Sequence, residues 1–457
     1  MNNNVKNNAK AFTGMFSSGI GVMPLYMLIS AYLTYFYTNV IGVSAGAVGT
    51  IILVSKVFDG ISDVIFGNMV DNTKSKLGVC RPWILRCSFL IVVAIVCLFT
   101  VPTIGNGGKL VYIFLSYNFS TTIIYTITQV AVLSLPTYIT RNTKSQSVMF
   151  NLYNVGQSLI ATAVSGLTLP LVGKLGGDQK AWILVGAMYG ILCMIALLIT
   201  FILCKEDQEL AHLKKEGGKE QQEKYTLLQI LKSIVLNKYW IITLAISIVG
   251  SSMNTARLTL TSYYAQYVLE DVAKASLINS ATTFPGIIAC FCCIPLLVKL
   301  KKRTALLCSI TLIIISSGIV FIDPTSMTIL IVSSVIFSFG VSMCVPIASA
   351  MLGNVIEYGE WKTGIRSQAA LMGANSAGQK IGQGVITAAV SWIMALSGFD
   401  GTAAVQTEAA INSISNLFIF LPIVLTVIQL ILTMSYTLDK KYPSIMKDLE
   451  ERRNKNK

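Results

Sequence analysis

Two aspartates lie inside an apolar segment, SKVFDGISDVIFGNMVD, where acidic side chains are costly. Asp59 and Asp63 are four residues apart, so on a helix they share one face. A charge near the centre of a bilayer costs about 2.5–3.5 kcal/mol on insertion scales, and such residues therefore face a cavity, a partner or an ion. Clustered oxygen ligands suit hard cations, so the pair predicts a cation site with Na⁺ as the candidate metal ion. Ser62 and Thr126 add hydroxyl oxygens if their two helices pack together.

Two other interpretations of this pair stay open. In one, a carboxylate is protonated because its neighbour is charged, which makes the pair a proton-coupling site. In the other, Lys56 neutralises Asp59 three residues away, and Asp63 only joins helices through a hydrogen bond. We favour a coupling role, because one lysine cannot neutralise two aspartates at membrane depth. The sequence leaves the choice between Na⁺ and H⁺ open.

Basic and polar side chains in other apolar segments predict a cavity for a polar solute. Lys380, in GANSAGQKIGQG, stands too deep in its segment for the ammonium to reach the membrane surface easily. We expect it to contact substrate or to pair with an acid of the other half, whereas Arg257 either binds substrate or links helices. Amide, phenol and hydroxyl groups suit a hydroxyl-rich solute, although they also bridge helices. The candidates of this kind are Tyr125, Gln129, Asn154 and Ser376.

These side chains require a membrane and a set of helices to position them. Hydrophobic residues make up 54% of the 457 residues and charged residues only 12%, against roughly 25% charged in an ordinary soluble domain. A helix crosses the hydrocarbon core with about 20 apolar residues. Segments of this kind predict an all-α integral membrane protein with twelve transmembrane helices, at 12–38, 44–70, 82–102, 110–136, 147–172, 180–204, 238–266, 275–299, 303–322, 326–353, 368–397 and 411–437.

The basic residues are distributed unevenly between the two sides of these spans. Both termini fall on one side, which holds 28 of the 35 Lys and Arg, whereas the opposite loops hold four. The positive-inside rule therefore predicts cytoplasmic termini in a multi-pass protein of the cell (inner) membrane. The net charge of +14 is explained by this topology and does not indicate a nucleic-acid partner.

A charged stretch containing KEDQELAHLKKEGGKEQQEK divides the apolar segments six and six. The predicted organisation is an N-terminal six-helix bundle at 1–204, a cytoplasmic linker at 205–237, a C-terminal six-helix bundle at 238–437 and a cytoplasmic tail at 438–457. In transporters built from two such halves, the substrate site lies between the halves near the bilayer midplane. We therefore expect the polar candidates to gather there.

Motifs of other protein classes are missing from the sequence. It has no Gly-Lys-Ser/Thr phosphate loop, and its one histidine, His212, lies in the polar linker, so no histidine-based catalytic triad can be built. The ten cysteines show neither metal-ligand nor disulfide spacing. The polar start MNNNVKNNA does not read as a cleaved signal peptide. We expect no enzyme activity and no resident cofactor.

Two stretches resemble a known family. KVFDGISDVIFGNMVDNTKSKLGVCRPWIL (56–85) is similar to the signature of the glycoside-pentoside-hexuronide:cation symporters. That signature has a basic residue three places before the first of two aspartates, and ends in a basic loop with Arg/Lys-Pro-Trp. GNVIEYGEWKTGIR (353–366) resembles the family's cytoplasmic connection between helices ten and eleven. The resemblance covers nearly the whole chain and implies the major facilitator fold with alternating access.

Carried over by position, the resemblance implies roles for individual residues. The family's cation site falls on Asp59, Ser62, Asp63 and Thr126, its coupling lysine on Lys380 and a cavity tyrosine on Tyr125. Within the matched stretches, the candidates for coupling or gating are Lys56, Asp71, Arg81, Glu357 and Arg366.

The sugar site departs from the family's melibiose carriers. Met23 stands in place of an acidic residue, Gln129 and Leu133 in place of Asp and Trp, and Asn154 in place of Arg. A different sugar, a uronide or a less polar cargo is therefore expected in place of a galactoside.

The sequence as a whole predicts a monomeric cation-coupled symporter that imports a sugar, glycoside or uronide by alternating access in the lipid bilayer of a bacterial cell. The rival hypothesis within the transporters is an exporter, or a carrier of a more apolar or amphiphilic, lysolipid-like solute. The rival from another class is a membrane sensor that does not transport.

Overall fold

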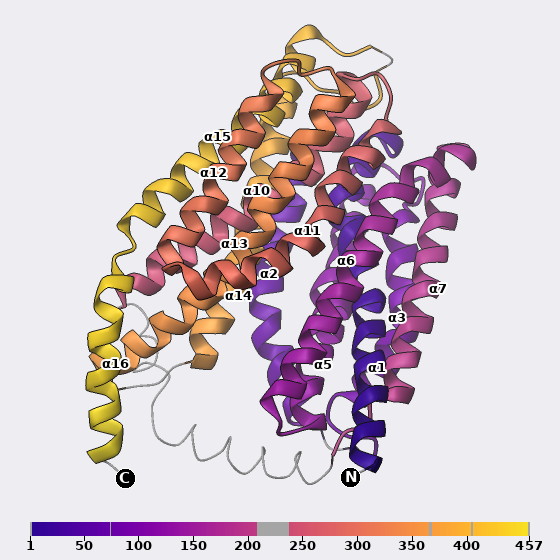
Figure 1. The fold of residues 1–457 in the computed structure, drawn as a ribbon. Helices are drawn as coiled ribbons and strands as arrows, with labels where there is room; N and C mark the ends of the chain where they lie inside the picture. The colour runs from indigo at the N-terminus through magenta and orange to yellow at the C-terminus, as the bar shows by residue number, and fades with distance from the viewer. Residues whose placement is uncertain (1, 74, 208–236, 365–367, 404, 456–457) are drawn as a thin grey trace.

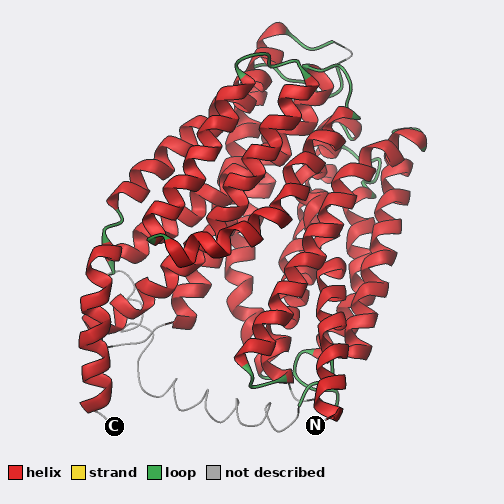
Figure 2. Ribbon diagram, viewed as in Figure 1, coloured by secondary structure: helices red, strands yellow, loops and turns green. Residues whose placement is uncertain are grey.

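A computed structural model describes residues 2–73, 75–207, 237–364, 368–403 and 405–455. The described residues form helices joined by short loops, with no strand among them (Figure 2). Helices are expected here, because in hydrocarbon every backbone N–H and C=O has to bond within its own segment or a closed barrel.

The first half of the chain contributes six long helical segments, two of which contain π-helical turns. They are α1 (Asn2–Met27) with η1 (Leu28–Leu33) and η2 (Phe36–Val40), α2 (Ala45–Asp71), α3 (Arg81–Phe99), α4 (Asn106–Asn118) with η3 (Phe119–Tyr125) and α5 (Thr126–Ile139), α6 (Thr143–Lys174) and α7 (Gln179–Leu203). The second half contributes α10 (Lys238–Tyr267), α11 (Lys274–Lys299), α12 (Lys302–Val320), α13 (Met327–Thr363), α14 (Gln368–Leu396), α15 (Glu408–Ser435) and α16 (Leu438–Lys455).

These helices agree closely with the spans predicted from hydropathy, with three differences. Helix α1 begins at Asn2, ahead of the predicted start at 12. Helix α13 continues to Thr363, past the predicted end at 353, so Glu357 lies on a helix and not in a connection. The predicted tail folds as α16, whose Leu438, Ile445 and Leu449 are buried in one apolar cluster with Tyr358 of α13. Arg366 lies outside the described residues.

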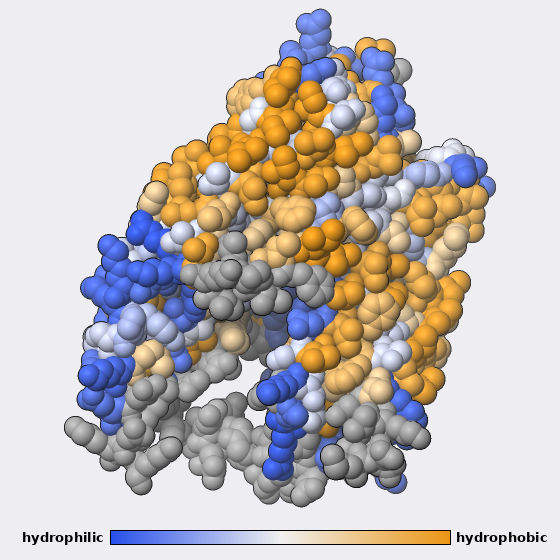
Figure 3. Space-filling model, viewed as in Figure 1, coloured by the Kyte–Doolittle hydropathy of each residue, from blue (hydrophilic) through white to orange (hydrophobic). Residues whose placement is uncertain are grey.

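The outer surface has the polarity of a membrane protein. Within the described ranges, nine helices are long and apolar enough to cross a bilayer. Apolar side chains cover the middle of the molecule, and hydrophilic side chains gather toward its two ends (Figure 3). The chain is therefore a multi-pass membrane protein, and the element order is consistent with the predicted twelve crossings.

The two halves meet along helices that pack closely. Helix α2 packs on α14, α6 on α11, and η1 on α10. Glycines allow the α2–α14 approach, because a Cβ added to Gly384 would lie 2.7 Å from the Cβ of Lys56. In the glycine-rich run of α14, Gly378 and Gly382 pack against Ile248 of α10, whereas Gly373 has open space beside it.

Both termini lie at one end of the molecule, and at this end the halves stand apart (Figure 1). The space-filling view shows a hollow between them there, with hydrophilic side chains along part of its edge (Figure 3). The described residues therefore form two halves that are open toward the side of the termini.

At the opposite end, side chains of the first helix bond to α10 and close the molecule. The Thr38 and Tyr263 hydroxyls lie 2.8 Å apart, and the Tyr35 hydroxyl donates to Gln266 Oε1 at 3.3 Å. Asn39 donates to the Tyr267 hydroxyl as well. We call this set the distal gate: Tyr35, Thr38, Asn39, Tyr263, Gln266 and Tyr267.

Candidate functional site

Asp59 lies in the middle of α2 and is almost completely buried, with 2% of its surface exposed. Its Oδ2 lies 3.1 Å from Lys56 Nζ. Its Oδ1 accepts hydrogen bonds from the hydroxyls of Thr121 at 3.1 Å and Thr122 at 2.5 Å. Both oxygens of this carboxylate therefore have donors, as a buried charge requires.

The two threonines that donate to Asp59 lie in a π-helical turn. Thr121 and Thr122 belong to η3, where the helix is locally wider, and π-turns of this kind are frequent at functional sites. Asn118 extends the network, since it accepts from Thr122 at 3.1 Å and donates to Ser55 at 2.8 Å.

Asp63, one turn further along α2, is paired with a lysine of the other half. Lys380 Nζ of α14 lies 2.5 Å from Asp63 Oδ1, and the two side chains are 14% and 19% exposed. Both charges thus lie where the halves meet. This ion pair is one of the two contacts expected for Lys380 from the sequence.

The electrostatics of the site follow from these two ion pairs. Two aspartates are balanced by two lysines, each carboxylate with its own ammonium group. In the described part of the chain, no three His, Cys, Asp or Glu side chains cluster as a metal site. A bound cation would therefore have to displace an ammonium group and complete its shell with hydroxyl or carbonyl oxygens.

The two other predicted cation ligands have different hydrogen-bond partners. The Ser62 hydroxyl donates to the main-chain oxygen of Asp59 at 2.9 Å, and that of Thr126 to the main-chain oxygen of Thr121 at 3.1 Å. Sequence reasoning missed Thr121 and Thr122. The paired threonines in SYNFSTTIIY were the available signal of polar ligands in this segment, but the hydropathy pattern does not predict the π-helical turn.

The predicted substrate residues are spread over several helices. The Tyr125 ring stacks on that of Tyr26 of α1, with centroids 6.0 Å apart. Gln129 is half-buried one turn after Tyr125, while Asn154 of α6 and Ser376 of α14 are exposed. Ser376 precedes Lys380 by four residues and so shares its helical face.

Arg257 lies within the second half of the molecule. Its side chain is 3% exposed, its Nη2 donates to Ser334 of α13 at 3.2 Å, and its guanidinium lies 4.1 Å from the ring centre of Phe418 of α15. These contacts join three helices of one half, in line with the helix-linking alternative that the sequence left open.

The remaining gating candidates bond within their own halves. The Tyr138 hydroxyl donates to Asp71 at 3.2 Å, and Arg81 Nη2 donates to the main-chain oxygen of Phe201 at 2.9 Å. Glu357 accepts from the Tyr442 hydroxyl of α16. Each of these contacts joins residues of the same half, in agreement with the opening near the termini.

Two helical halves that are closed at one end, open at the other and joined by buried charges define a membrane transporter of the major facilitator type. The family model described as "MFS/sugar transport protein" matches residues 14–440. The chain belongs to this family, and it is a transporter and not an enzyme. The predicted resemblance to the glycoside-pentoside-hexuronide:cation symporters and the predicted major facilitator fold are confirmed.

Named relatives align with nearly the full length. The isoprimeverose transporter of Lactiplantibacillus pentosus is 26% identical, over 93% of this chain and 88% of its own. The putative glycoside/cation symporter YagG of Escherichia coli K12 is 28% identical, over 92% of this chain and 90% of its own. Among solved structures, a mutant form of the nucleoside transporter NupG superimposes with a TM-score of 0.67 at 13% identity. The match covers 93% of this chain and 99% of the NupG chain.

Proposed function

We propose that this protein is a secondary active transporter that couples the uptake of a sugar, glycoside or uronide to a cation, Na⁺ or H⁺. The proposal is supported by the printed functions of its relatives, an isoprimeverose transporter and a putative glycoside/cation symporter. It rests above all on the two carboxylates of α2, one of which is paired with a lysine of the opposite half.

In this proposal, Lys380 and Lys56 hold the aspartates while the coupling ion is away. A cation that enters at Asp59 and Asp63 competes with the lysine ammonium groups, with Thr121 and Thr122 as additional oxygen ligands beside Ser62 and Thr126. Displaced Lys380 is then available to substrate. Because linkage is reciprocal, bound substrate tightens cation binding by the same factor.

The loaded carrier rocks its halves about the site, and the cation gradient drives accumulation. The membrane potential adds about 2.3 kcal/mol per charge for each 100 mV. Tyr125, Gln129, Asn154 and Ser376 remain our candidates for substrate contacts, with Arg257 as a helix-linking or substrate residue. Lys56, Asp71, Arg81, Glu357 and Arg366 remain our candidates for coupling and gating.

The coupling assignment is tested with Asp59→Asn and Asp63→Asn in membrane vesicles. The substrate is first identified in wild-type vesicles by screening sugars, glycosides and uronides under imposed Na⁺ or H⁺ gradients. We expect each variant to lose gradient-driven accumulation, by about tenfold or more, while the protein amount in the membrane stays normal. Gradient-driven accumulation that persists in both variants would remove the coupling assignment.

The same vesicles distinguish import from export. An exporter, or a carrier of an amphiphilic solute, is the alternative, and one relative, 22% identical, is a putative 2,3-dihydroxypropane-1-sulfonate exporter of Escherichia coli K12. Amphiphiles are screened beside the sugars in right-side-out and inverted vesicles. Uptake confined to inverted vesicles would favour the exporter.

We also propose the orientation and organisation predicted from the sequence. The termini are cytoplasmic, the membrane is the bacterial cell (inner) membrane, and the protein works as a monomer. The division into bundles at 1–204 and 238–437, with the linker at 205–237 and the tail at 438–457, is part of this proposal.

A further inference from the structure

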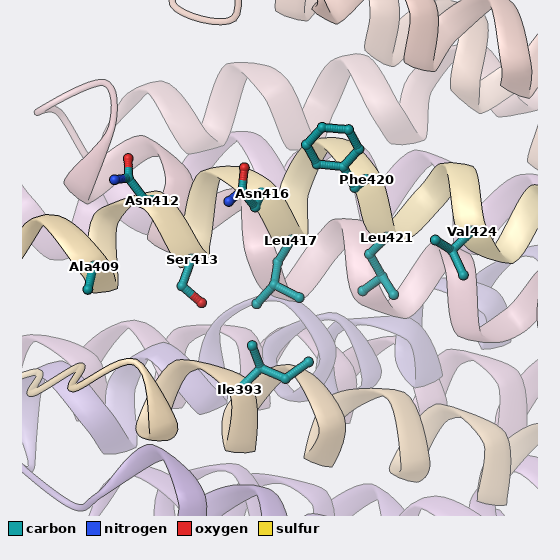
Figure 4. Close-up of a pocket in the computed structure, with 9 residues that line it drawn as sticks. All are labelled: Ile393, Ala409, Asn412, Ser413, Asn416, Leu417, Phe420, Leu421 and Val424. Atoms are coloured by element: carbon teal, nitrogen blue, oxygen red, sulfur yellow. The ribbon is translucent and has the colours of Figure 1, made fainter.

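A groove of about 500 Å³ lies between α14 and α15 on the side of the second half. Figure 4 shows two rows of α15 side chains along it, Asn412, Asn416 and Phe420 in one row, and Ser413, Leu417 and Leu421 in the other. Ile393 of α14 faces Leu417 from the opposite wall (Figure 4). None of these residues takes part in the ion pairs or in the distal gate.

One row of α15 changes steadily in polarity along the helix. Residues four apart form a ridge that winds slowly around a helix, and this ridge reads Glu408, Asn412, Asn416, Phe420 and Val424. All five side chains are exposed. The row thus runs from a charge through two amides to an aromatic and an aliphatic side chain.

The gradient matches the depth of a bilayer. At 1.5 Å per residue, the 28 residues of α15 span about 42 Å, against about 30 Å of hydrocarbon. For an upright helix centred in the bilayer, these lengths put Glu408 at headgroup level, Asn412 near the boundary and Phe420 well inside the hydrocarbon. The end that begins at Glu408 is the end opposite to the termini (Figure 1).

The amides of Asn412 and Asn416 would gain no hydrogen bonds from lipid tails alone. Asn416 lies about 6 Å deeper than Asn412, at the level where a polar group without a partner is costly. In the part of the chain that the structure describes, neither amide is paired with another protein group. Both line the groove, so a ligand there can accept hydrogen bonds from them.

The segment that precedes the groove-lining residues of α15 is acidic. Residues 397–412, SGFDGTAAVQTEAAIN, carry the acids Asp400 and Glu408 and no basic residue. An anionic headgroup is repelled by this charge, whereas an ammonium headgroup is attracted to it.

We propose that this groove binds one phospholipid with an ammonium headgroup, such as phosphatidylethanolamine, from the leaflet opposite to the termini. The ammonium group lies near Glu408, the ester carbonyls accept from Asn412 and Asn416, and one acyl chain lies along Leu417, Phe420 and Leu421. A second copy of this chain fits less well, because these three large side chains hold a partner helix away from the close approach that small residues permit.

The test uses the full-length protein, reconstituted in vesicles with equal amounts of phosphatidylethanolamine and phosphatidylglycerol. Retained lipid is counted by native mass spectrometry after extraction in mild detergent. We expect the wild type to keep one phosphatidylethanolamine in preference to phosphatidylglycerol. The double variant Asn412→Leu/Asn416→Leu should retain it about tenfold more weakly, since two hydrogen bonds are lost.

Further variants separate the parts of the proposal. Glu408→Gln should keep a bound lipid but lose the preference for the ammonium headgroup. Leu417→Trp should fill the groove and displace the lipid with both amides in place. Thr311→Leu, which removes an exposed polar side chain of α12, is the matched control and should behave as wild type.

Two results would overturn the proposal. One is equal lipid retention by the wild type, the double variant and Leu417→Trp. The other is a wild-type dimer that the Asn412→Leu/Asn416→Leu substitutions dissociate, because the groove would then hold a second copy. Neither result bears on cation coupling, which the α2 aspartate variants test separately.

Discussion

Lys380 and Asp63 form an ion pair between the two halves of the molecule, and its position gives it a special energetic role. Both side chains are mostly buried, at 14% and 19% exposed. Breaking a buried pair by removing one partner is strongly destabilising, because an uncompensated charge remains. The pair links the two halves in this structure, and in the proposed mechanism the coupling cation competes with the ammonium group for Asp63.

Replacing Lys380 by Gln should expose this competition. In cation-free buffer, we expect Lys380→Gln to lower the free energy of unfolding by about 2–4 kcal/mol, somewhat less than for a fully buried pair. Added Na⁺ should then stabilise the variant more than the wild type, because the internal competitor is gone. Thermal unfolding of the purified protein with and without Na⁺ measures both effects.

Lys380→Arg serves as the control, since it keeps the positive charge and should keep the wild-type response. Na⁺ is not the coupling ion if it stabilises Lys380→Gln no more than the wild type. If the unfolding of the two proteins then differs in its dependence on pH, the coupling ion is a proton. If neither ion distinguishes them, Lys380 does not compete for the site.

At the scale of the elements, backbone contact between α1 and α6 builds the first half. A Cβ on Gly156 would lie 2.2 Å from the main-chain oxygen of Phe16, and one on Gly19 2.2 Å from that of Tyr153. Small residues are what lets transmembrane helices come this close. Tyr26 of α1 also stacks on Tyr125 of η3, so α1 contacts a second element of this half.

Gly156→Ala should therefore force α1 and α6 apart. We expect a loss of about 1–3 kcal/mol in the free energy of unfolding, the usual range for overpacking. Gly173→Ala in the same helix has no atom within 4 Å of the added methyl group, and should be neutral or slightly stabilising because Ala favours helix. Equal unfolding temperatures for the two variants would contradict the close packing of these helices.

At the scale of the whole molecule, the contacts of the distal gate close the end opposite to the termini. Its contacts are hydrogen bonds and aromatic edges, including Phe399 against Tyr263 and Tyr267 with ring centroids 5.6 and 5.3 Å apart. Such polar contacts can be exchanged for water when the gate opens. The gate is therefore suited to a reversible opening and closing.

Gly401 provides a way to bias this equilibrium. A Cβ there would lie 2.4 Å from the main-chain oxygen of Thr38, so Gly401→Ala should oppose closure and shift the population toward the state open at this end. Hydrogen exchange of the segments 35–41 and 261–268 should become faster. Gly107→Ala, with no atom within 4 Å of its added methyl group, is the control. Equal hydrogen exchange in both variants would show that the methyl group of Gly401→Ala does not oppose closure of the distal gate.

The orientation in the membrane is tested with reporter fusions. A fluorescent protein fused to the C-terminus should be bright, and alkaline phosphatase at the same place inactive, because the positive-inside rule predicts a cytoplasmic tail. Phosphatase inserted in the loop 321–326 should be active. The opposite pattern would invert the topology, and with it the leaflet assigned to the lipid groove.

The sequence by itself determined the helical spans, the sharing of one end by both termini, and the family. These features depend on hydropathy and charge along the chain, which are local properties. It also singled out Asp59, Asp63 and Lys380, because a charged residue in a long apolar segment can be recognised without knowing its contacts in the fold.

Only the tertiary structure decided which groups those charges meet. Lys380 and Asp63 are 317 positions apart, and their contact depends on how closely α2 and α14 pack. Thr121 and Thr122 reach Asp59 from a π-helical turn of another helix, and the extension of α13 and the folding of α16 depend on mutual packing. Long-range contacts arise from the joint burial of many surfaces, so no local pattern encodes them.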